Sequence, residues 1–516
     1  MLDFKEFLDT IQKFLGKELL EHISYPNLEM LRISRARINP LTKFLFRSNA
    51  RLRGIFGVEQ GKNYLLNYVF DMEHFKAGLT VLVATIVDKQ TNINSISPDY
   101  ELAEVLEQDV NNRLGIEFFL PKPMERQGYL CAPFRLAVES SRDNLFQYGI
   151  FDNIHRNNYY FEFNFNRNIV KDIELKTGWL FRGIQEQLSQ ANPYDSIQPI
   201  LSRISGLMAV HHQIAYYSGV ESLLKLKISN KVAIIRTLFA EIERIENHLI
   251  WFGNFMNLLS HEQMYVDLVK HWKGLIGFIK FLNNNQPHLA ETLCLGGCIE
   301  ISNETAFKAL QFARQICPPL FNQLYDIIYS DFVKEKCSGI GFISREDSYK
   351  YGFTGPNLRA SGNIIDIRHT SPYLLYTFGE VSQKWNVISF TQGDVYARAQ
   401  VRLWEIKESY SIIEYILRSL ETYSSNVEIP PITQDKKLLP MNEIAISKVE
   451  SPHGELIYYL KTDPEKRTDK LYSVRIVTPD MLNFYGLRYA GLLGQKLSNI
   501  PNIIHSMDIS FENVDL

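Results

Sequence analysis

Residues 339–368 read GIGFISREDSYKYGFTGPNLRASGNIIDIR, and this stretch decides how the rest of the chain is interpreted. Its centre, TGPNLRASG, places small residues, glycines and a proline around the single basic residue Arg359. Glycine and proline permit unusual backbone angles. The loop therefore either presents Arg359 to an anion, a carboxylate or a cofactor edge, or is a structural turn. The residues alone favour neither interpretation.

Long runs with helical periodicity lie on both sides of this stretch, at residues 200–224, 232–259, 303–333 and 395–422. Strand-like runs accompany them: YYFEFNF comes before the helices, and ELIYYLKT and LYSVRIVT follow. We therefore expect a mainly helical domain with strand-rich flaps from about residue 130 onward.

The N-terminal part has a different pattern. Residues 1–50 are expected to be helical and then loop-like, residues 64–88 to form two strands, and residues 100–114 to form a helix. The segment LPKPMERQ at residues 120–127 has the composition of a boundary. The prediction is an α+β protein with a small α/β domain over residues 1–125 and a second domain over 126–516.

The composition is that of a globular protein with a large core: 516 residues, 45% apolar and 22% charged. A net charge of −3 argues against bulk nucleic-acid binding. The longest apolar run, residues 77–87, is too short to cross a hydrocarbon core of about 30 Å. Acidic residues interrupt the N-terminus, so no signal peptide is expected. These features predict a cytoplasmic protein, or one docked on the cytoplasmic side of a membrane.

The five cysteines, Cys131, Cys294, Cys298, Cys317 and Cys337, form no C-x-x-C pair. A four-cysteine pattern of the usual iron–sulfur or zinc spacing is absent from the sequence. Even the closest pair, Cys294 and Cys298, is best interpreted as buried thiols.

Two further groups could carry chemistry. Glu241, Arg244 and His248 recur at spacings that place them on one helix face, where a salt-bridged helix surface is favoured over a functional role. The adjacent His211 and His212 would point about 100° apart on a helix, so they cannot both face one metal. The sequence has no nucleotide-binding, zinc-protease or nucleophile-elbow motif, and its residues alone predict only a soluble mixed α and β protein.

The segments are more informative taken in order. They include WLFRGI at 179–184, SRISG at 202–206, the Glu241–His248 group, residues 339–368, GDVY at 393–396, SPHGELIYYL at 451–460 and IPNIIHSMDISFENVD at 500–515. Residues 126–516 thereby resemble the D-type (49 kDa) subunit of NADH:quinone oxidoreductase (complex I) and the large subunit of energy-converting [NiFe] hydrogenases. The N-terminal part, with SI at 95–96, EQD at 107–109 and LGIEF at 114–118, resembles the C-type (30 kDa) subunit of the same enzyme.

A fusion of the C-type and D-type subunits is typical of formate-hydrogenlyase-type hydrogenases. The resemblance implies a peripheral subunit on the cytoplasmic side of the membrane. It also implies two kinds of partner: the small iron–sulfur subunit of complex I (the B-type subunit), which would hold the clusters, and antiporter-like membrane subunits. Any link to NAD would run through other subunits.

The hydrogenase version of this domain binds nickel and iron through four cysteine thiolates. The matching positions here hold Ser205, Met208, Ser510 and Asn513. Hydroxyl, thioether and amide groups cannot replace four soft thiolates, so the sequence argues against a nickel–iron centre.

The quinone-reducing version has a tyrosine at the position of Gly206 and an aspartate where Asn257 and Leu258 stand here. An arginine of the family matches Cys294 or Leu295. The family's N-terminal histidine loop is replaced by residues 149–155, where Asp152 or His155 could substitute. A quinone head group needs polar partners at the end of an apolar tunnel, and these differences count against ordinary quinone reduction. The candidate catalytic residues that remain are His212, His248, His288 and Arg359.

The residues that match the framework of the family's cavity, and its interface with the iron–sulfur subunit, are Arg182, Arg203, Glu241, Arg244, Arg359, Asp366 and Arg368. They could equally hold the fold together as buried ion pairs. Three hypotheses follow. The chain transfers electrons to a quinone or another acceptor in a complex that moves ions, or it is a redox-inert scaffold that couples such a complex. The third, a [NiFe] hydrogenase, is disfavoured.

Overall fold

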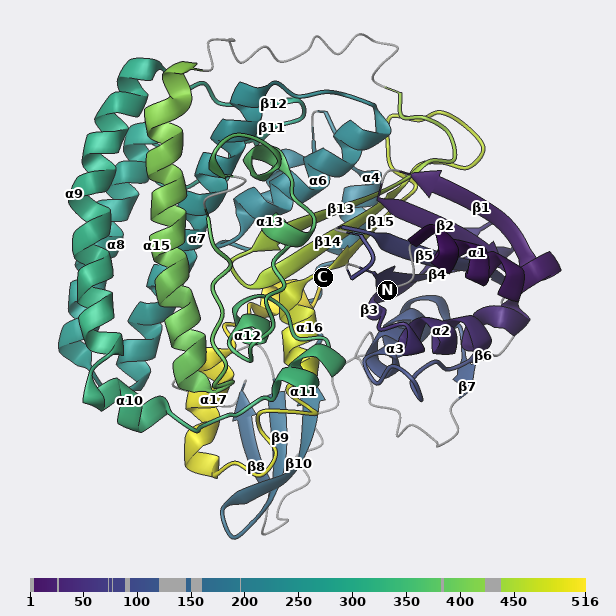
Figure 1. Ribbon diagram of the computed structural model, residues 1–516, viewed down its shortest axis with the longest axis horizontal. Helices are drawn as coiled ribbons and strands as arrows, with labels where there is room; N and C mark the ends of the chain where they lie inside the picture. The colour runs from purple at the N-terminus through teal and green to yellow at the C-terminus, as the bar shows by residue number, and fades with distance from the viewer. Residues whose placement is uncertain are drawn as a thin grey trace.

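In the computed structural model the chain has an α+β fold (Figure 1). The structure describes residues 4–25, 27–72, 74–76, 78–88, 93–119, 145–149, 160–194, 196–381, 385–422 and 438–516. The predicted boundary near residue 125, Cys131, Asp152 and His155 lie outside these ranges. None of the helices in the described part of the chain combines the length and apolar composition of a membrane span.

The N-terminal part is built on a five-stranded sheet with the order β1-β2-β5-β4-β3. Its neighbours are antiparallel except for β2 and β5, which run parallel. The elements are α1 (Phe4–Leu15), β1 (Leu19–Tyr25), β2 (Leu28–Ile33), α2 (Ile38–Arg47), β3 (Arg51–Gln60), β4 (Asn63–Asp71), β5 (Thr80–Asp88) and α3 (Ala103–Leu114). The short strands β6 (Ile93–Asn94) and β7 (Phe118–Phe119) pair beside them.

The two strands predicted over residues 64–88 and the helix over 100–114 are confirmed. The expectation of a loop after the first helix was wrong, because β1, β2 and α2 occupy that stretch. Strand β2 is stabilised by a neighbour about fifty residues away in the sequence, since Leu28 pairs with Thr80 and Arg32 with Ala84. The local periodicity of the sequence cannot predict a pairing between strands so far apart in the chain.

Long helices form one side of the molecule, upright in Figure 1. Helix α7 packs on α8 and α15, and α9 packs on α8 and α15. Their bounds are α7 (Asn230–Leu258), α8 (Glu262–Leu282), α9 (Asn303–Ile328) and α15 (Val395–Ser419). Side-chain caps set their starts: Ser229 accepts from Val232 N, Ser302 from Thr305 N and Asp394 from Ala397 N.

A three-stranded antiparallel sheet lies between these helices and the N-terminal sheet (Figure 1). It consists of β13 (Ile444–Ser451), β14 (Gly454–Lys461) and β15 (Ser473–Val477). Helix α6 (Ala209–Leu223) packs on β13 and β14. Smaller helices complete this region: α4 (Ile184–Gln190), α5 (Gln198–Leu201), α10 (Asp331–Cys337), α11 (Arg345–Lys350), α12 (Gly355–Arg359), α13 (Ile367–Thr370), α16 (Pro479–Gly486), α17 (Ile500–Ser506) and α18 (Phe511–Val514).

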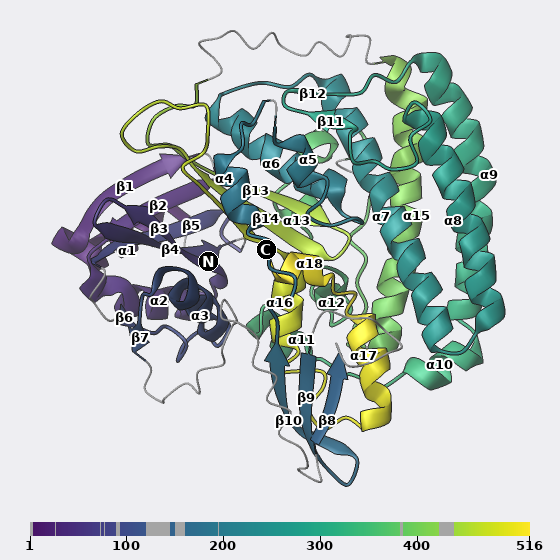
Figure 2. The same ribbon diagram turned by 180° about the vertical axis from the view of Figure 1, so that it is seen from behind.

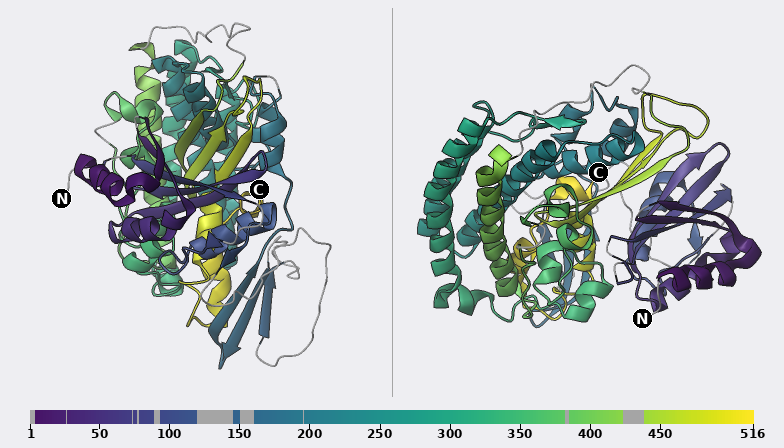
Figure 3. Two further views of the ribbon diagram at one scale, coloured as in Figure 1. Left: turned by 90° about the vertical axis from the view of Figure 1, so that its right-hand side faces the viewer. Right: turned by 45° about the horizontal axis from the view of Figure 1, so that its top comes forward.

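A third sheet, with the order β10-β9-β8, projects from the body beside α17 (Figures 2 and 3). It contains β8 (Leu145–Gly149), β9 (Tyr160–Asn166) and β10 (Ile169–Lys176). A hairpin of β11 (Leu293–Cys294) and β12 (Gly297–Cys298) lies near the start of α7.

One predicted helix differs in a way that matters for the site. Residues 200–224 were expected to form a single helix, but α5 ends at Leu201 and α6 begins at Ala209. The intervening residues 202–208 form turns, with Arg203 and Gly206 exposed and Ser205 and Met208 buried. The break exposes the backbone N–H groups at the start of α6 to a side chain of α7.

Candidate functional site

Arg359 lies at the end of α12, where it is fully buried among carboxylates. Its Nη1 lies 2.6 Å from Glu450 Oε1, and its Nη2 lies 2.5 Å from Glu405 Oε1. Asp366 Oδ2 is 3.3 Å from Nη1. Although burial raises the pKa of Glu405, Arg359, His248 and Arg244 together outweigh it and hold that pKa well below its usual range. The Arg359 side chain is therefore an ion-pair centre rather than a group presented to an open cavity.

The Glu241, Arg244 and His248 group is also buried, so its interpretation as a salt-bridged helix surface was wrong. All three side chains are inaccessible to solvent. Arg244 Nε lies 3.3 Å from Glu241 Oε2, and its Nη1 and Nη2 groups donate to the backbone carbonyls of Ser451 and Glu450. Helix α7 thus uses this face to fasten β13 to the helical layer.

Glu241 continues the network on its other side. It accepts hydrogen bonds from Tyr376, in the 3-10 helix Leu374–Thr377, and from Ser409 on α15. Arg368 bridges Glu241, at 3.3 Å, and Asp366, at 2.8 Å. The predicted alternative, that these framework residues are buried ion pairs, therefore describes the observed contacts of Glu241, Arg244, Arg359, Asp366 and Arg368.

We call this network the Arg359 cluster; it consists of Glu241, Arg244, Arg359, Asp366, Arg368, Glu405 and Glu450. His248 joins it through Glu405. Its Nε2 lies 2.9 Å from Glu405 Oε2, while Glu405 Oε1 contacts Arg359. Burial lowers the pKa of His248 to about 4 against the opposing effect of Glu405. A neutral imidazole that donates its Nε2 hydrogen to the carboxylate fits these values, so His248 is held as a hydrogen-bond donor.

The four residues that the sequence analysis matched to the hydrogenase thiolates, Ser205, Met208, Ser510 and Asn513, lie around one polar region. Ser205 Oγ is 3.5 Å from Ser510 Oγ. Asp480 accepts hydrogen bonds from Ser510 N and from Asn513 Nδ2. Met208, buried, immediately precedes α6. Their hydroxyl, amide and thioether groups lack the charge and softness of thiolates and do not fit a nickel–iron centre; within the described ranges, no group of three or more His, Cys, Asp and Glu side chains is arranged to hold a metal.

His212 lies beside this region and is fully buried. Its ring nitrogens lie 2.7 Å from Tyr458 OH and 3.2 Å from Asn513 Oδ1. Burial lowers the pKa of His212 to about 3, so the ring is neutral. His212 and His248, on different helices, belong to different groups of contacts.

His453 is a residue for which the sequence suggested no role. It follows β13 in the motif SPHGE, and its Nδ1 lies 2.6 Å from Asp480 Oδ1. Its Nε2 lies 3.3 Å from Asp508 Oδ2. Burial alone lowers the pKa of His453, but Asp480 and Asp508 outweigh it and raise that pKa to about 9. The result is a buried imidazolium between two aspartates.

Two of the predicted site residues, Arg203 and His288, line one pocket of about 310 Å³. Gly206, which the sequence analysis matched to the family's tyrosine, lies in the same wall. We call this cavity the Arg203 pocket; its walls are Ser202, Arg203, Gly206, Ala209, Glu243, Glu246, Pro287, His288, Leu289, Ala290 and Glu291. The break between α5 and α6 opens this space.

Glu243 forms the buried part of that wall, and no pattern in the sequence singled it out. Its carboxylate accepts hydrogen bonds from Val210 N at 2.8 Å and His211 N at 3.1 Å, and lies 2.6 Å from His211 Nδ1. It therefore caps the start of α6. The signal available in the sequence was a second glutamate two residues after Glu241, on a different side of the same helix.

Arg182 has a structural position. It is half-buried and donates to the carbonyls of Arg203, Ile204 and Glu512. It thereby ties the segment before α6 to the C-terminal segment. Neither Arg182 nor Arg203, in the interactions described for them, joins the carboxylates of the Arg359 cluster.

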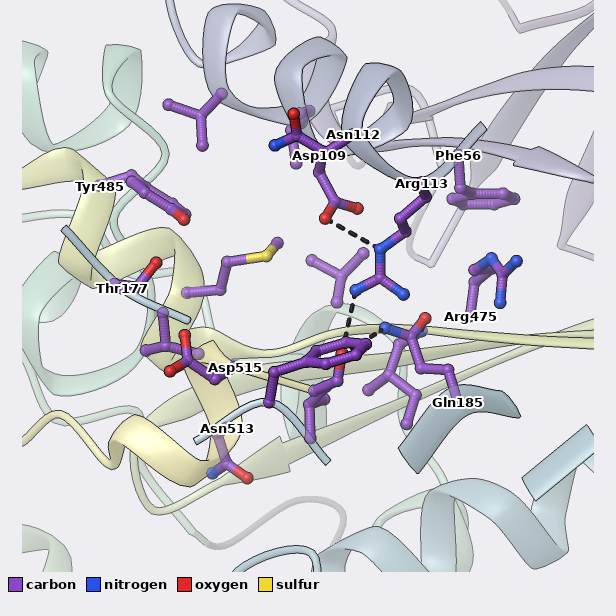
Figure 4. A pocket seen from close by; sticks show the side chains of 18 of the residues that line it. Phe56, Asp109, Asn112, Arg113, Thr177, Gln185, Arg475, Tyr485, Asn513 and Asp515 are labelled. Carbon is purple, nitrogen blue, oxygen red and sulfur yellow. Dashed lines mark hydrogen bonds and ion pairs between the residues drawn. The ribbon is translucent and has the colours of Figure 1, made fainter. Parts of the chain in front are cut away.

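A second cavity, of about 100 Å³, lies between α3 and the C-terminal segment (Figure 4). Arg113 of α3 bonds Asp109, at 2.9 Å, and the carbonyl of Leu516 across it. Asn513 borders this cavity as well as contacting His212. Apolar side chains of the N-terminal sheet and α3 line it together with polar side chains from both parts of the chain. This cavity therefore lies in the packing of the N-terminal part on the rest.

The cysteines described by the structure, Cys294, Cys298, Cys317 and Cys337, are free thiols. Cys298 is buried, and burial raises the pKa of its thiol to about 12. The interpretation of the Cys294 and Cys298 pair as thiols of the protein interior is confirmed for Cys298, whereas Cys294 is only partly buried.

Comparisons with known proteins agree with this fold. Residues 289–516 match the family model described as "Respiratory-chain NADH dehydrogenase, 49 Kd subunit". The chain is 28% identical over 348 residues to the D-type subunit of the NADH-quinone oxidoreductase of Dehalococcoides mccartyi, covering 67% of this chain and 91% of that protein. It is 27% identical over 356 residues to the D-type subunit of the F(420)H(2) dehydrogenase of Methanosarcina mazei, covering 67% and 90%.

A carbon monoxide-induced hydrogenase of Rhodospirillum rubrum is 24% identical over 351 residues, covering 68% of this chain and 92% of that protein. Among solved structures, a chain of the membrane-bound sulfane sulfur reductase, an archaeal respiratory membrane complex, superposes with a TM-score of 0.64. It is 22% identical and covers 72% of this chain and 98% of that one, a likeness that shows the shared fold. Residues 289–516 therefore match the family of the 49 kDa subunit of the respiratory-chain NADH dehydrogenase, and the relatives of this chain include D-type subunits of such complexes.

Proposed function

We propose that this chain is a peripheral subunit of a membrane-bound, complex I-like oxidoreductase in which electrons pass toward an acceptor bound in the Arg203 pocket. The observation that carries the proposal is the pocket itself. Arg203 and His288, separated by 85 residues in the sequence, line one cavity of about 310 Å³ together with Gly206. A glycine leaves free the space that a tyrosine side chain would fill, and a Cβ atom at Gly206 would meet nothing within 4 Å.

The lining supports a polar acceptor. Arg203 and His288 are exposed side chains at the pocket, and Glu243 forms a buried part of its wall. These groups can donate hydrogen bonds to, and accept them from, the oxygens of a quinone head group. A quinone or another small polar oxidant is therefore the proposed acceptor class.

The partners follow from the same proposal. A small iron–sulfur subunit of the B type would deliver electrons to this pocket, and antiporter-like membrane subunits would move the ions. Residues 1–125 would serve as the C-type domain of a chain that fuses the C-type and D-type subunits, on the cytoplasmic side of the membrane. The relatives named above as subunits of quinone and F420H2 oxidoreductases, and the respiratory membrane complex with the same fold, support this assignment.

The first test is metal analysis and EPR spectroscopy of the affinity-purified native complex, reduced with dithionite and then exposed to air. Iron–sulfur signals without nickel support electron transfer to an altered acceptor site. Stoichiometric nickel would instead support the hydrogenase hypothesis, against the chemistry of Ser205, Met208, Ser510 and Asn513.

A second test addresses the pocket. The reduced complex is separated from dithionite and mixed with menadione, and oxidation of the clusters is followed with time. We expect Arg203→Met and His288→Phe to slow this oxidation at least tenfold. Lys308→Met, on an exposed side chain of α9, is the matched surface control and should leave the rate unchanged. Equal rates in all variants would remove the pocket from the proposal.

The Arg359 cluster favours a second candidate, a redox-inert scaffold that couples ion movement. Its charged side chains are buried and paired with one another, as expected of a rigid connector. A complex that contains neither iron nor nickel but still transports ions would establish this candidate. Transport that stops when the clusters are removed would exclude it.

A further inference from the structure

We propose that Glu243 holds an exchangeable proton in the wall of the Arg203 pocket and donates it to the reduced acceptor, and that His211 positions it. This inference rests on the proposed function. Glu243 is 4% exposed, and it borders the pocket from α7 while its carboxylate reaches the first turn of α6.

The contacts of Glu243 suit a group that alternates between two protonation states. Three donors converge on its oxygens: Val210 N at Oε1, and His211 N and Nδ1 at Oε2. They can stabilise the carboxylate once its proton has left, with help from the start of α6. In the protonated state the proton is on Oε1, which still accepts from Val210 N, while Oε2 keeps both lone pairs for His211 N and Nδ1.

His211 is suited to positioning rather than to proton donation. Burial, together with Arg244 and Arg368, keeps the pKa of His211 well below its usual range, so the ring stays neutral. A neutral ring with hydrogen on Nδ1 donates to Glu243 Oε2 in both states. His211 thus fixes the orientation of the carboxyl group.

The surroundings of Glu243 place its titration near neutral pH. Burial raises the pKa of Glu243 to about 8, with the N–H groups of Val210 and His211 acting against it and Glu246 adding to it. Arg244 follows it on α7, and Arg203, His288 and Glu291 line the same pocket. Burial also raises the pKa of Glu246 to about 6, so Glu246 is the more acidic of the two carboxyls.

The proposed step balances as follows. Two electrons from the partner's clusters reduce the bound acceptor, and a quinone-type oxygen becomes an anion. The O–H bond of Glu243 breaks, the proton forms a new O–H bond on that anion, and the electron pair stays on the Glu243 carboxylate. The second proton of a two-electron reduction comes from solvent at the rim, where His288 and Glu291 are exposed.

One measurement detects the proton without any acceptor. Infrared difference spectra of the purified chain between pH 7 and pH 9 report carboxyl groups that lose a proton in this range. We expect Glu243→Gln to remove one carboxyl band from the wild-type spectrum. Glu107 and Glu455, whose pKa burial raises to about 7, contribute to both proteins alike. An unchanged set of bands would overturn the inference.

The second measurement is the menadione-driven oxidation of the reduced complex between pH 6 and 9.5. We expect Glu243→Gln to slow it at least tenfold and to abolish its dependence on pH near 8. Glu246→Gln should move that dependence to lower pH, because it removes a like charge. Glu243→Asp, which keeps an acidic proton, should restore part of the rate.

His211→Asn separates positioning from proton donation. It should slow the reaction while the carboxyl band of Glu243 remains, since the proton is still present. A Glu243→Gln complex with the wild-type rate and pH dependence would overturn the donor role. If menadione does not oxidise the clusters of the wild-type complex, both the proposed function and the proton-donation step are wrong. The infrared measurement needs no acceptor, so it still shows whether Glu243 holds the proton.

Discussion

The backbones of Gly355 and Gly454 lie in direct contact, where the loop that leads to Arg359 meets the turn between β13 and β14. A Cβ atom on Gly355 would lie 2.3 Å from His453 O, and one on Gly454 would lie 2.6 Å from Gly355 N. Both residues have a positive φ, of 63° and 132°. The two segments in contact also carry two buried ion pairs, Arg359 with Glu450 and His453 with Asp480. Two sequence motifs about one hundred residues apart thus form one structural unit.

Replacing Gly355 with alanine should destabilise the chain by about 3 kcal/mol or more, because overpacking adds to the cost of a left-handed backbone. The free energy of unfolding, measured with denaturant on the purified chain, reports this loss. Gly339→Ala is the matched control, since Gly339 has a φ of 70° but open space around its Cβ position. It should lose only the backbone part, roughly 1 kcal/mol. Equal losses in the two variants would refute the close contact.

Arg359→Met should cost roughly 3–5 kcal/mol, because it leaves buried carboxylates without their partner. Glu405, Glu450 and Asp366 all contact this guanidinium, and each is buried. Arg359→Lys should recover only part of the loss, since an ammonium cannot reproduce the planar contacts. Arg314→Met is the surface control, because the Arg314 side chain is exposed and pairs with Glu414. This variant should have the unfolding midpoint of the wild type. A wild-type midpoint for Arg359→Met would mean that solvent reaches the cluster.

Periodicity was sufficient to predict α7 and α15, and the structure shows the capping residue of each. The expected helix over 232–259 is α7 with its Ser229 cap, and that over 395–422 is α15 with its Asp394 cap. The apolar run over residues 77–87 likewise predicted a strand, which the structure shows as β5. These signals are local, so a single sequence contains them.

The site depends on contacts between distant segments, which a local pattern does not contain. Arg359 was a candidate, but its partners Glu405 and Glu450 lie 46 and 91 residues further along. Helical spacing correctly placed Glu241, Arg244 and His248 on one face, but it could not show that β13 and α15 bury that face. The role of Glu243 could not be predicted, because it depends on the break before α6, which lets Val210 and His211 donate hydrogen bonds to its carboxylate.

The N-terminal sheet should unfold together with the rest of the chain, because buried ion pairs cross between them. Lys448 of β13 contacts Asp71 of β4, and Arg53 of β3 contacts Glu455 of β14, with all four side chains at most 5% exposed. Calorimetry should therefore show one main transition. Asp71→Asn should lower its midpoint by removing the nearer carboxylate from Lys448, which keeps only the longer contact of 3.9 Å with Glu455 among its described ion pairs. Arg32→Met, in the partly exposed pair with Glu21 on the same sheet, should not lower it. Two separate transitions in the wild type would contradict this coupling.

His453 should make the stability of the chain depend on pH between about 6.5 and 9. Asp480 and Asp508 overcome the effect of burial and raise the pKa of His453 from 6.5 to about 9 in the folded chain. A folded-state pKa above the unfolded value means that the imidazolium contributes fully below pH 6.5. That contribution is lost as the pH rises through 9. The shift corresponds to roughly 3 kcal/mol, measurable as a falling free energy of unfolding across this range.

His453→Arg is the informative variant, because arginine keeps a positive charge throughout this range. Its free energy of unfolding should lack the decrease that His453 causes between pH 6.5 and 9. His453→Gln should be less stable than the wild type at pH 6, since Asp480 loses its charged partner, and the difference should shrink toward pH 9. If His453→Arg showed the same decrease as the wild type, the pH dependence would have to come from another group. Glu243, whose pKa burial raises to about 8, is the first candidate for it, because a raised carboxyl pKa makes its contribution fall from about pH 4.5 to 8.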